Sequence, residues 1–169
     1  MFKVAKKFGF ACGGILIGIF MLSKSIGVVP FIDYNQFFLD IVFFAVFVGF
    51  ASREFKRGFN GGYLHFWQGM TVGFFVYAIA IVIFLIFLIA YFLIDVNALQ
   101  DYQQAARGYY MSIKETFVDE FGQEAFEEAL QAIEEASARQ LLMSSILKKL
   151  FAAILVTPVM SIILRRKPD

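Results

Sequence analysis

Three charged residues interrupt the apolar stretches of the chain and are the candidates for chemistry within a membrane. Asp40 lies in the apolar run Phe37–Ser52, and Lys148 and Lys149 directly precede the run Leu150–Leu164. Charged groups in the hydrocarbon interior are costly and are usually paired or functional. Helical rise, counted from the ends of the two runs, places all three about 10 Å below the outer boundary. The spacing therefore predicts an ion pair between Asp40 and one of the two lysines.

Two other interpretations of Asp40 stay open at this point. Its carboxylate can lie in the headgroup region while the lysine side chains extend outward to the surface. A proton relay is the other interpretation, but a relay needs a second acid inside the apolar runs, and the sequence has none there.

Pro158, Cys12 and His65 are further residues whose types could serve a site. Pro158 follows Thr157 inside the last apolar run, where it predicts a helix kink with a freed carbonyl near residue 154. We interpret the kink as a structural bend, with a gating hinge or ligand contact as the alternative. Cys12 is the only cysteine, so we expect a packing residue. His65 has no second ligand at metal-binding spacing.

No motif of the chain predicts catalysis. The serines lack a G-x-S-x-G elbow, and neither a P-loop nor a dinucleotide fingerprint is present. A net charge of +1 gives no field that would recruit nucleic acid. We therefore expect a protein that is not an enzyme, with no catalytic residues, no cofactor, no metal site and no nucleic-acid partner.

The elements that position these residues are four apolar stretches. Of the 169 residues, 60% are hydrophobic and 17% are charged, whereas soluble domains carry about a quarter charged residues. The run Met70–Ile94 has no charge, and its length of about 37 Å exceeds a hydrocarbon core of about 30 Å. We predict an all-α, integral membrane four-helix bundle forming one membrane domain over 1–169, with spans at about 8–28, 34–52, 67–94 and 142–164.

Lysine and arginine positions predict the orientation of these spans. Nine bases cluster at the N-terminus, at the second connection and in the tail, and all nine fall on one side if both termini are cytoplasmic. They are Lys3, Lys6, Lys7, Arg53, Lys56, Arg57, Arg165, Arg166 and Lys167. The connection after the third span has ten acids against three bases, which is typical of a segment on the outer side.

That connection, residues 95–141, predicts an amphipathic helical hairpin. Asn97 can cap a first helix, and Gly122 is a plausible break before a second one. The first interpretation is that the apolar stripes bury against each other and against the third span. The second is a docking surface for a partner protein. Flat binding to the bilayer is disfavoured because interfacial helices carry basic polar faces.

Glycines of the first span form two helical pairs on different faces. Gly9 and Gly13 make one pair, and Gly14 and Gly18 make the other. Small residues at this spacing allow helices to approach closely. We favour packing within the chain over dimerisation.

The second connection carries a motif that resembles a known bacterial family. It reads Arg53-Glu-Phe-Lys56-Arg57-Gly-Phe-Asn-Gly61-Gly62-Tyr63-Leu-His-Phe66-Trp-Gln68-Gly69 and leads into a glycine-containing third span. The motif resembles small four-span membrane proteins called domain of unknown function 4199. This resemblance implies an inner-membrane location and a four-span layout, but no activity. Independently, Gly61 and Gly62 would permit a tight turn, and the neighbouring bases suggest a site for a lipid headgroup or phosphate.

Two functions from different classes follow from these features. The first is a non-enzymatic accessory or scaffold subunit of the bacterial inner membrane, which contacts an envelope partner through its acidic outer helices or forms a homo-oligomer. The alternative is a small transporter or lipid-linked substrate carrier that uses a cavity near Asp40 and Pro158.

Overall fold

The computed structural model describes residues 1–28, 30–31 and 34–166, with the side chains of residues 34 and 35 left aside. This part of the chain is helical, as predicted, and its β pairing is an isolated bridge between Leu64 and Arg166. Lys167, one of the nine clustered bases, lies outside the described residues. The seven helices are α1 (Phe2–Ser25), α2 (Tyr34–Phe59), α3 (Phe66–Ile94), α4 (Ala98–Ser112), α5 (Lys114–Phe121), α6 (Gln123–Glu134) and α7 (Ala138–Leu164).

Four of these helices, α1, α2, α3 and α7, are long and apolar enough to cross a membrane. The prediction of four spans is thus confirmed, and the chain is a multi-pass membrane protein. Three of the helices are longer than the apolar runs: α1 begins at Phe2, α2 continues to Phe59 and α7 begins at Ala138. The helical backbone thus continues past the apolar run into the charged residues that flank it. A helix boundary does not have to coincide with the end of an apolar run.

The chain forms two compact units. One unit, the bundle, comprises Met1–Phe87 and Ser145–Asp169. The other, the acidic unit, comprises Leu88–Ser144.

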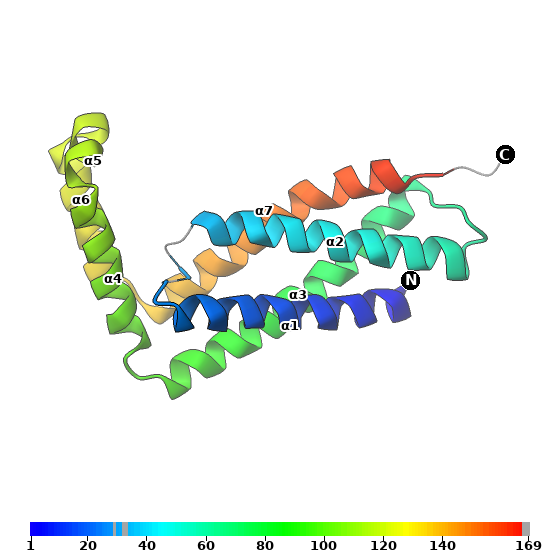
Figure 1. Ribbon diagram of the computed structural model, residues 1–169, viewed down its shortest axis with the longest axis horizontal. Helices are drawn as coiled ribbons and strands as arrows, with labels where there is room; N and C mark the ends of the chain where they lie inside the picture. Colours follow the sequence, from blue (N-terminus) through cyan, green and yellow to red (C-terminus); the bar gives the residue numbers. More distant parts are fainter. Residues whose placement is uncertain (29, 32–33, 167–169) are drawn as a thin grey trace. The chain divides into compact units, whose positions relative to one another are not determined.

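Within the bundle, the N-terminus, the α2–α3 connection and the end of α7 lie at one end (Figure 1). Leu64 and Arg166 exchange backbone hydrogen bonds of 2.9 and 3.0 Å there. Lys7 forms an ion pair of 2.9 Å with Glu54, which links α1 to α2 at the same end. We call this part of the bundle the basic end.

Glycines set how closely the helices of the bundle approach. A Cβ added to Gly9 would lie 2.8 Å from the Cβ of Ile79, and one added to Gly13 would lie 3.0 Å from the Cβ of Ile83. These two glycines therefore let α1 contact α3. Among the described residues, no atom lies within 4 Å of a Cβ added to Gly14 or Gly18, so in this part of the chain the first of the two glycine pairs is the one that packs against another helix.

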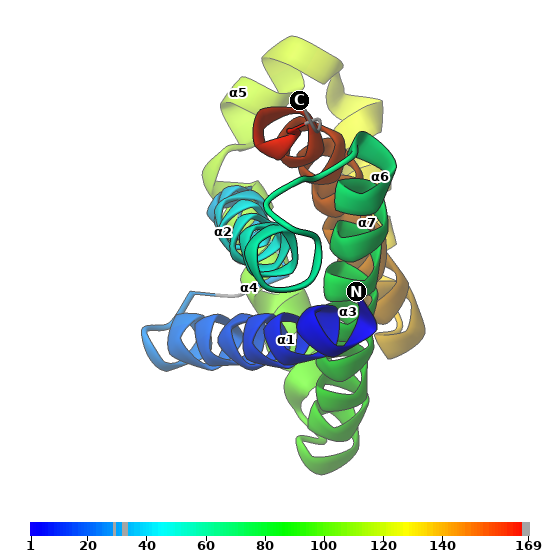
Figure 2. The ribbon, with the colours of Figure 1, turned by 90° about the vertical axis from the view of Figure 1, so that its right-hand side faces the viewer.

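Helix α7 is held against α3 in the same manner. A Cβ on Gly73 would come 2.5 Å from Cγ2 of Thr157, and one on Gly69 would come 2.8 Å from Oγ of Ser161. The hydroxyl groups of Thr157 and Ser161 donate to carbonyls one turn earlier, at 2.7 Å in both cases. Their polarity is thereby satisfied inside the bundle, and the helix continues through Pro158. Figure 2 shows the bundle viewed from its basic end.

Between α3 and α7 the acidic unit forms three helices, α4, α5 and α6, where the sequence predicted two. Gly122, with φ of +91°, separates α5 from α6 as predicted. A further break occurs at Ile113, whose φ of −108° and ψ of 12° leave helical geometry between α4 and α5. Asn97 occupies the N-cap position of α4 without a side-chain capping bond. Phe126 is buried and contacts the ring of Phe117 at 6.0 Å between centroids.

Candidate functional site

Asp40 of α2 and Lys149 of α7 form an ion pair within the bundle. The Nζ of Lys149 donates to Oδ1 of Asp40 at 2.9 Å and to Oδ2 at 2.7 Å. The Asp40 side chain is 5% exposed and the Lys149 side chain 3%. Both residues belong to helices able to span a membrane. The structure therefore brings together two charges that are 109 positions apart in the sequence.

Helical periodicity explains why the two side chains point inward. Asp40 begins a buried stripe of α2 that continues with Phe44, Val48 and Ser52, each one turn further along. Lys149 lies on a buried stripe of α7 that continues with Ala153 and then Thr157. The contacts of Thr157 with α3 fix the rotation of α7 that aims Lys149 at α2.

Aromatic rings surround the ion pair. The Nζ of Lys149 lies 4.3 Å from the centroid of the Phe84 ring, which is a favourable position for a cation over an aromatic face. Phe20 contacts Phe84 edge to face, with centroids 6.0 Å apart. The ammonium group thus has the carboxylate on one side and a ring on another, so little of it is left for a substrate.

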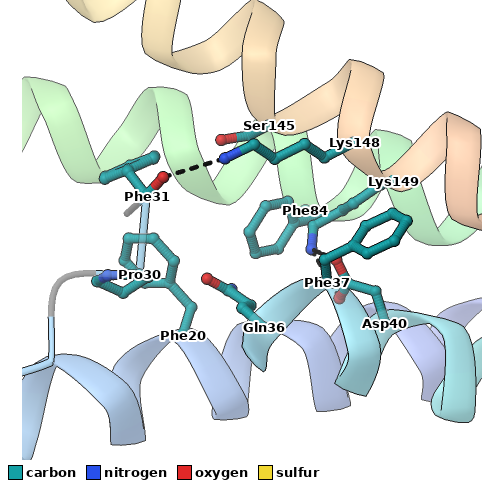
Figure 3. Close-up of a pocket in the computed structure, with 10 residues that line it drawn as sticks. All are labelled: Phe20, Pro30, Phe31, Gln36, Phe37, Asp40, Phe84, Ser145, Lys148 and Lys149. Carbon is teal, nitrogen blue, oxygen red and sulfur yellow. Dashed lines mark hydrogen bonds and ion pairs between the residues drawn. The ribbon is translucent and has the colours of Figure 1, made fainter. Parts of the chain in front are cut away.

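Lys148, the other predicted partner of Asp40, makes a different contact. Its Nζ donates to the backbone carbonyl of Phe31 at 3.1 Å, and the side chain is exposed. Figure 3 shows Lys148 turned toward the α1–α2 connection and Lys149 turned toward Asp40. Lys148 therefore ties this connection to α7, while Lys149 alone of the two lysines forms a hydrogen bond with the carboxylate.

A small cavity adjoins the ion pair. Its volume is about 30 Å³, which is enough for roughly one water molecule and far below the roughly 300 Å³ of a small ligand site. Its lining mixes four phenylalanines with polar groups (Figure 3): Phe20, Pro30, Phe31, Gln36, Phe37, Asp40, Phe84, Ser145, Lys148 and Lys149.

Pro158 lies in a separate cavity, on the α3 side of α7. This cavity has a volume of about 350 Å³ and an apolar lining. It shares no lining residue with the cavity beside Asp40. Asp40 and Pro158 thus line two different cavities, whereas the carrier hypothesis assumed a cavity near both. The lining residues are Met70, Thr71, Phe74, Phe75, Tyr77, Ile154, Thr157 and Pro158.

The Gly61–Gly62 motif forms the tight turn that the sequence predicted. Both glycines have positive φ, of 59° and 87°, a conformation that glycine adopts without strain. Asn60 donates from Nδ2 to the carbonyl of Tyr63 and to Oε1 of Gln68, both at 2.8 Å. Asn60 and Gln68 were not singled out in the sequence analysis. Amide side chains on both sides of a Gly-Gly turn are nevertheless a signal for hydrogen bonds across it.

The three bases of the motif have different surroundings. Lys56 donates from Nζ to the carbonyl of Leu164 at 3.1 Å and so satisfies the C-terminal end of α7. Arg53 and Arg57 are exposed. Across the described residues, no group of three His, Cys, Asp or Glu side chains is arranged to hold a metal ion, and His65 is exposed at the start of α3.

Comparisons with known proteins identify a family. No curated protein and no solved structure matches the sequence. The model of the family described as "Protein of unknown function (DUF4199)" matches residues 7–166, a range that includes the motif of the second connection and both partners of the ion pair. The chain therefore belongs to this DUF4199 family, as the motif predicted.

Proposed function

We propose that the protein is a non-enzymatic membrane subunit whose acidic unit contacts a partner in the cell envelope. The observation that carries this proposal is that the two opposite charges inside the bundle pair with each other. Asp40 and Lys149 neutralise each other through two hydrogen bonds. The cavity beside them, of about 30 Å³, holds no more than a water molecule. The ion pair then serves to hold α2 against α7.

The acidic unit, in contrast, presents many charges to solvent. Its sequence carries ten acids and three bases, a net charge of −7. The exposed residues of α6 include Glu124, Glu127 and Glu128, while Phe126 of the same helix is buried. Such a face attracts a basic surface and speeds its association, because complementary potentials steer the encounter. A partner with a basic patch fits this chemistry.

The orientation that this proposal requires has both termini in the cytoplasm of a bacterium and the acidic unit outside the inner membrane. It is supported by the bases of the basic end, among them Lys3, Arg57 and Arg165, since positive loops stay inside. Cys12 is fully buried, so an introduced cysteine can be labelled selectively. A membrane-impermeant maleimide should label Glu127→Cys in intact cells and Lys3→Cys only after permeabilisation. The reverse pattern would contradict the orientation.

A pull-down in gentle detergent tests the partner. We compare the wild type with a triple variant that replaces Glu124, Glu127 and Glu128 by glutamine, and expect the variant to lose the co-purified partner. The matched control replaces three exposed acids of α5, Glu115, Asp119 and Glu120, by their amides and should retain it. A chain that stays a lone monomer under every condition would refute the proposal.

A further inference from the structure

An apolar groove runs between α2 and α7 toward the basic end of the bundle. Its volume is about 290 Å³. At its rim, Val46 is 43% exposed and Phe50 is 52% exposed, so the groove opens toward the surroundings of the bundle. The lining residues are Ala45, Val46, Gly49, Phe50, Arg53 and Met160.

Gly49 lets the side chain of Met160 come close to the backbone of α2 in this groove. A Cβ added there would lie 2.8 Å from the terminal methyl group of Met160, so a larger side chain at this position must displace Met160 or enter the groove. From Ala45 to Arg53 the helix rises about 12 Å, eight residues at about 1.5 Å each. This length covers most of one membrane leaflet, which is about 15 Å of hydrocarbon. The groove therefore has the dimensions of an acyl chain that lies along α2.

Arg53 closes the groove at its polar end. Its neighbour Glu54 is held by Lys7 at 2.9 Å, and Lys56 is used by the carbonyl of Leu164. Among the residues that the structure describes, none forms an ion pair with Arg53. Arg57 lies one turn further along the same face and is exposed as well. The guanidinium group of Arg53 is thus available, and its planar donors suit a phosphate oxygen pair.

We propose that this groove binds one anionic phospholipid, with an acyl chain along Gly49 and Met160 and the phosphate at Arg53. An apolar trough that ends in a free arginine matches an amphiphile with one negative group and a long tail. A second copy of the chain fits less well, because it would have to bring a carboxylate to the end of an apolar strip.

Native mass spectrometry of the full-length protein tests this proposal. The protein is released from membranes that contain phosphatidylglycerol and phosphatidylcholine, and the ratio of the two retained lipids is measured. Arg53→Gln should lower the retained phosphatidylglycerol ratio about fivefold, the effect of one basic residue at a membrane surface. Gly49→Leu fills the groove and should remove the retained lipid itself.

Two matched controls separate the groove from general effects. Lys3→Gln removes one charge from the same end of the bundle, on α1, and should leave the lipid ratio unchanged. Gly14→Leu adds the same side chain where no atom lies within 4 Å and should keep the lipid. If Gly49→Leu fails to fold, Val46→Trp at the groove rim replaces it, with the same expected loss of lipid.

Three results would overturn the proposal. An equal loss of phosphatidylglycerol in Lys3→Gln and Arg53→Gln would mean diffuse surface attraction. Retention of lipid when the groove is filled would place that lipid elsewhere. A change in oligomeric state on filling the groove, with the lipid ratio intact, would make the groove an interface between two copies of the chain.

Discussion

Breaking the Asp40–Lys149 pair is the sharpest perturbation that the structure offers. Asp40→Asn leaves the Lys149 ammonium group without a counter-charge at 3% exposure, and Lys149→Met leaves the carboxylate alone in the same way. Removing one partner of a buried ion pair costs about 3–5 kcal/mol. If the sites were independent, the double variant would lose the sum of both effects, about 6–10 kcal/mol.

We expect the double variant to lose no more than about 3 kcal/mol, because methionine fills the volume of lysine and neither charge is left to bury. The coupling energy of the pair is then at least about 3 kcal/mol. The assay is reversible unfolding in mixed micelles, followed by circular dichroism, for the wild type, both single variants and the double variant. Lys148→Met is the matched control, since Lys148 bonds to the Phe31 carbonyl, and it should show little coupling to Asp40→Asn. Additive effects of Asp40→Asn and Lys149→Met would refute the reasoning.

Three further predictions concern packing and the acidic unit. Gly13→Leu should lower the free energy of unfolding by about 1–3 kcal/mol because α3 leaves no room, whereas Gly14→Leu, with open space, should leave it unchanged; the same micelle assay compares them. Phe126→Ala should weaken the acidic unit by about 3–5 kcal/mol, seen as faster amide exchange in α6; unchanged exchange would contradict its buried role. Burial raises the pKa of Tyr102 above its usual value of 10.0, so the folded acidic unit holds this proton more tightly than the unfolded chain. The stability of the acidic unit should therefore fall as pH rises past about 10. Tyr102→Phe should reduce that fall when amide exchange is measured at a series of pH values.

The apolar helices and one member of the ion pair, Asp40, can be predicted from the sequence alone. Asp40 is the single acid within an apolar run, and the cost of an unpaired charge there makes a basic partner the natural expectation. The choice between Lys148 and Lys149 could not be made, because adjacent residues differ by about 100° around a helix. Which of the two lysines faces α2 depends on the rotation of α7 about its axis. This rotation is set by the contacts of α7 with α3 at Gly69 and Gly73, which cannot be read from the local sequence.

Other features escaped prediction for related reasons. The break at Ile113 interrupts an apolar stripe that is continuous in the sequence, so periodicity favoured a single helix there. The amides of Asn60 and Gln68 meet only after the Gly61–Gly62 turn has formed. The close approach of Met160 to Gly49 joins α7 to α2, two helices far apart in the sequence. The last of these features depends on a contact between two helices, which a local sequence pattern does not contain.

The most direct measurement for the central claim is photo-crosslinking from the acidic unit in living cells. A photoreactive amino acid replaces Glu127 on the exposed face of α6, and a matched variant carries it at Ile162, an exposed apolar position of α7. We expect a discrete protein adduct from position 127 that disappears when Glu124 and Glu128 are also changed to glutamine, and no such adduct from position 162. Absence of an adduct at position 127, or an adduct that persists without the neighbouring acids, would contradict the account.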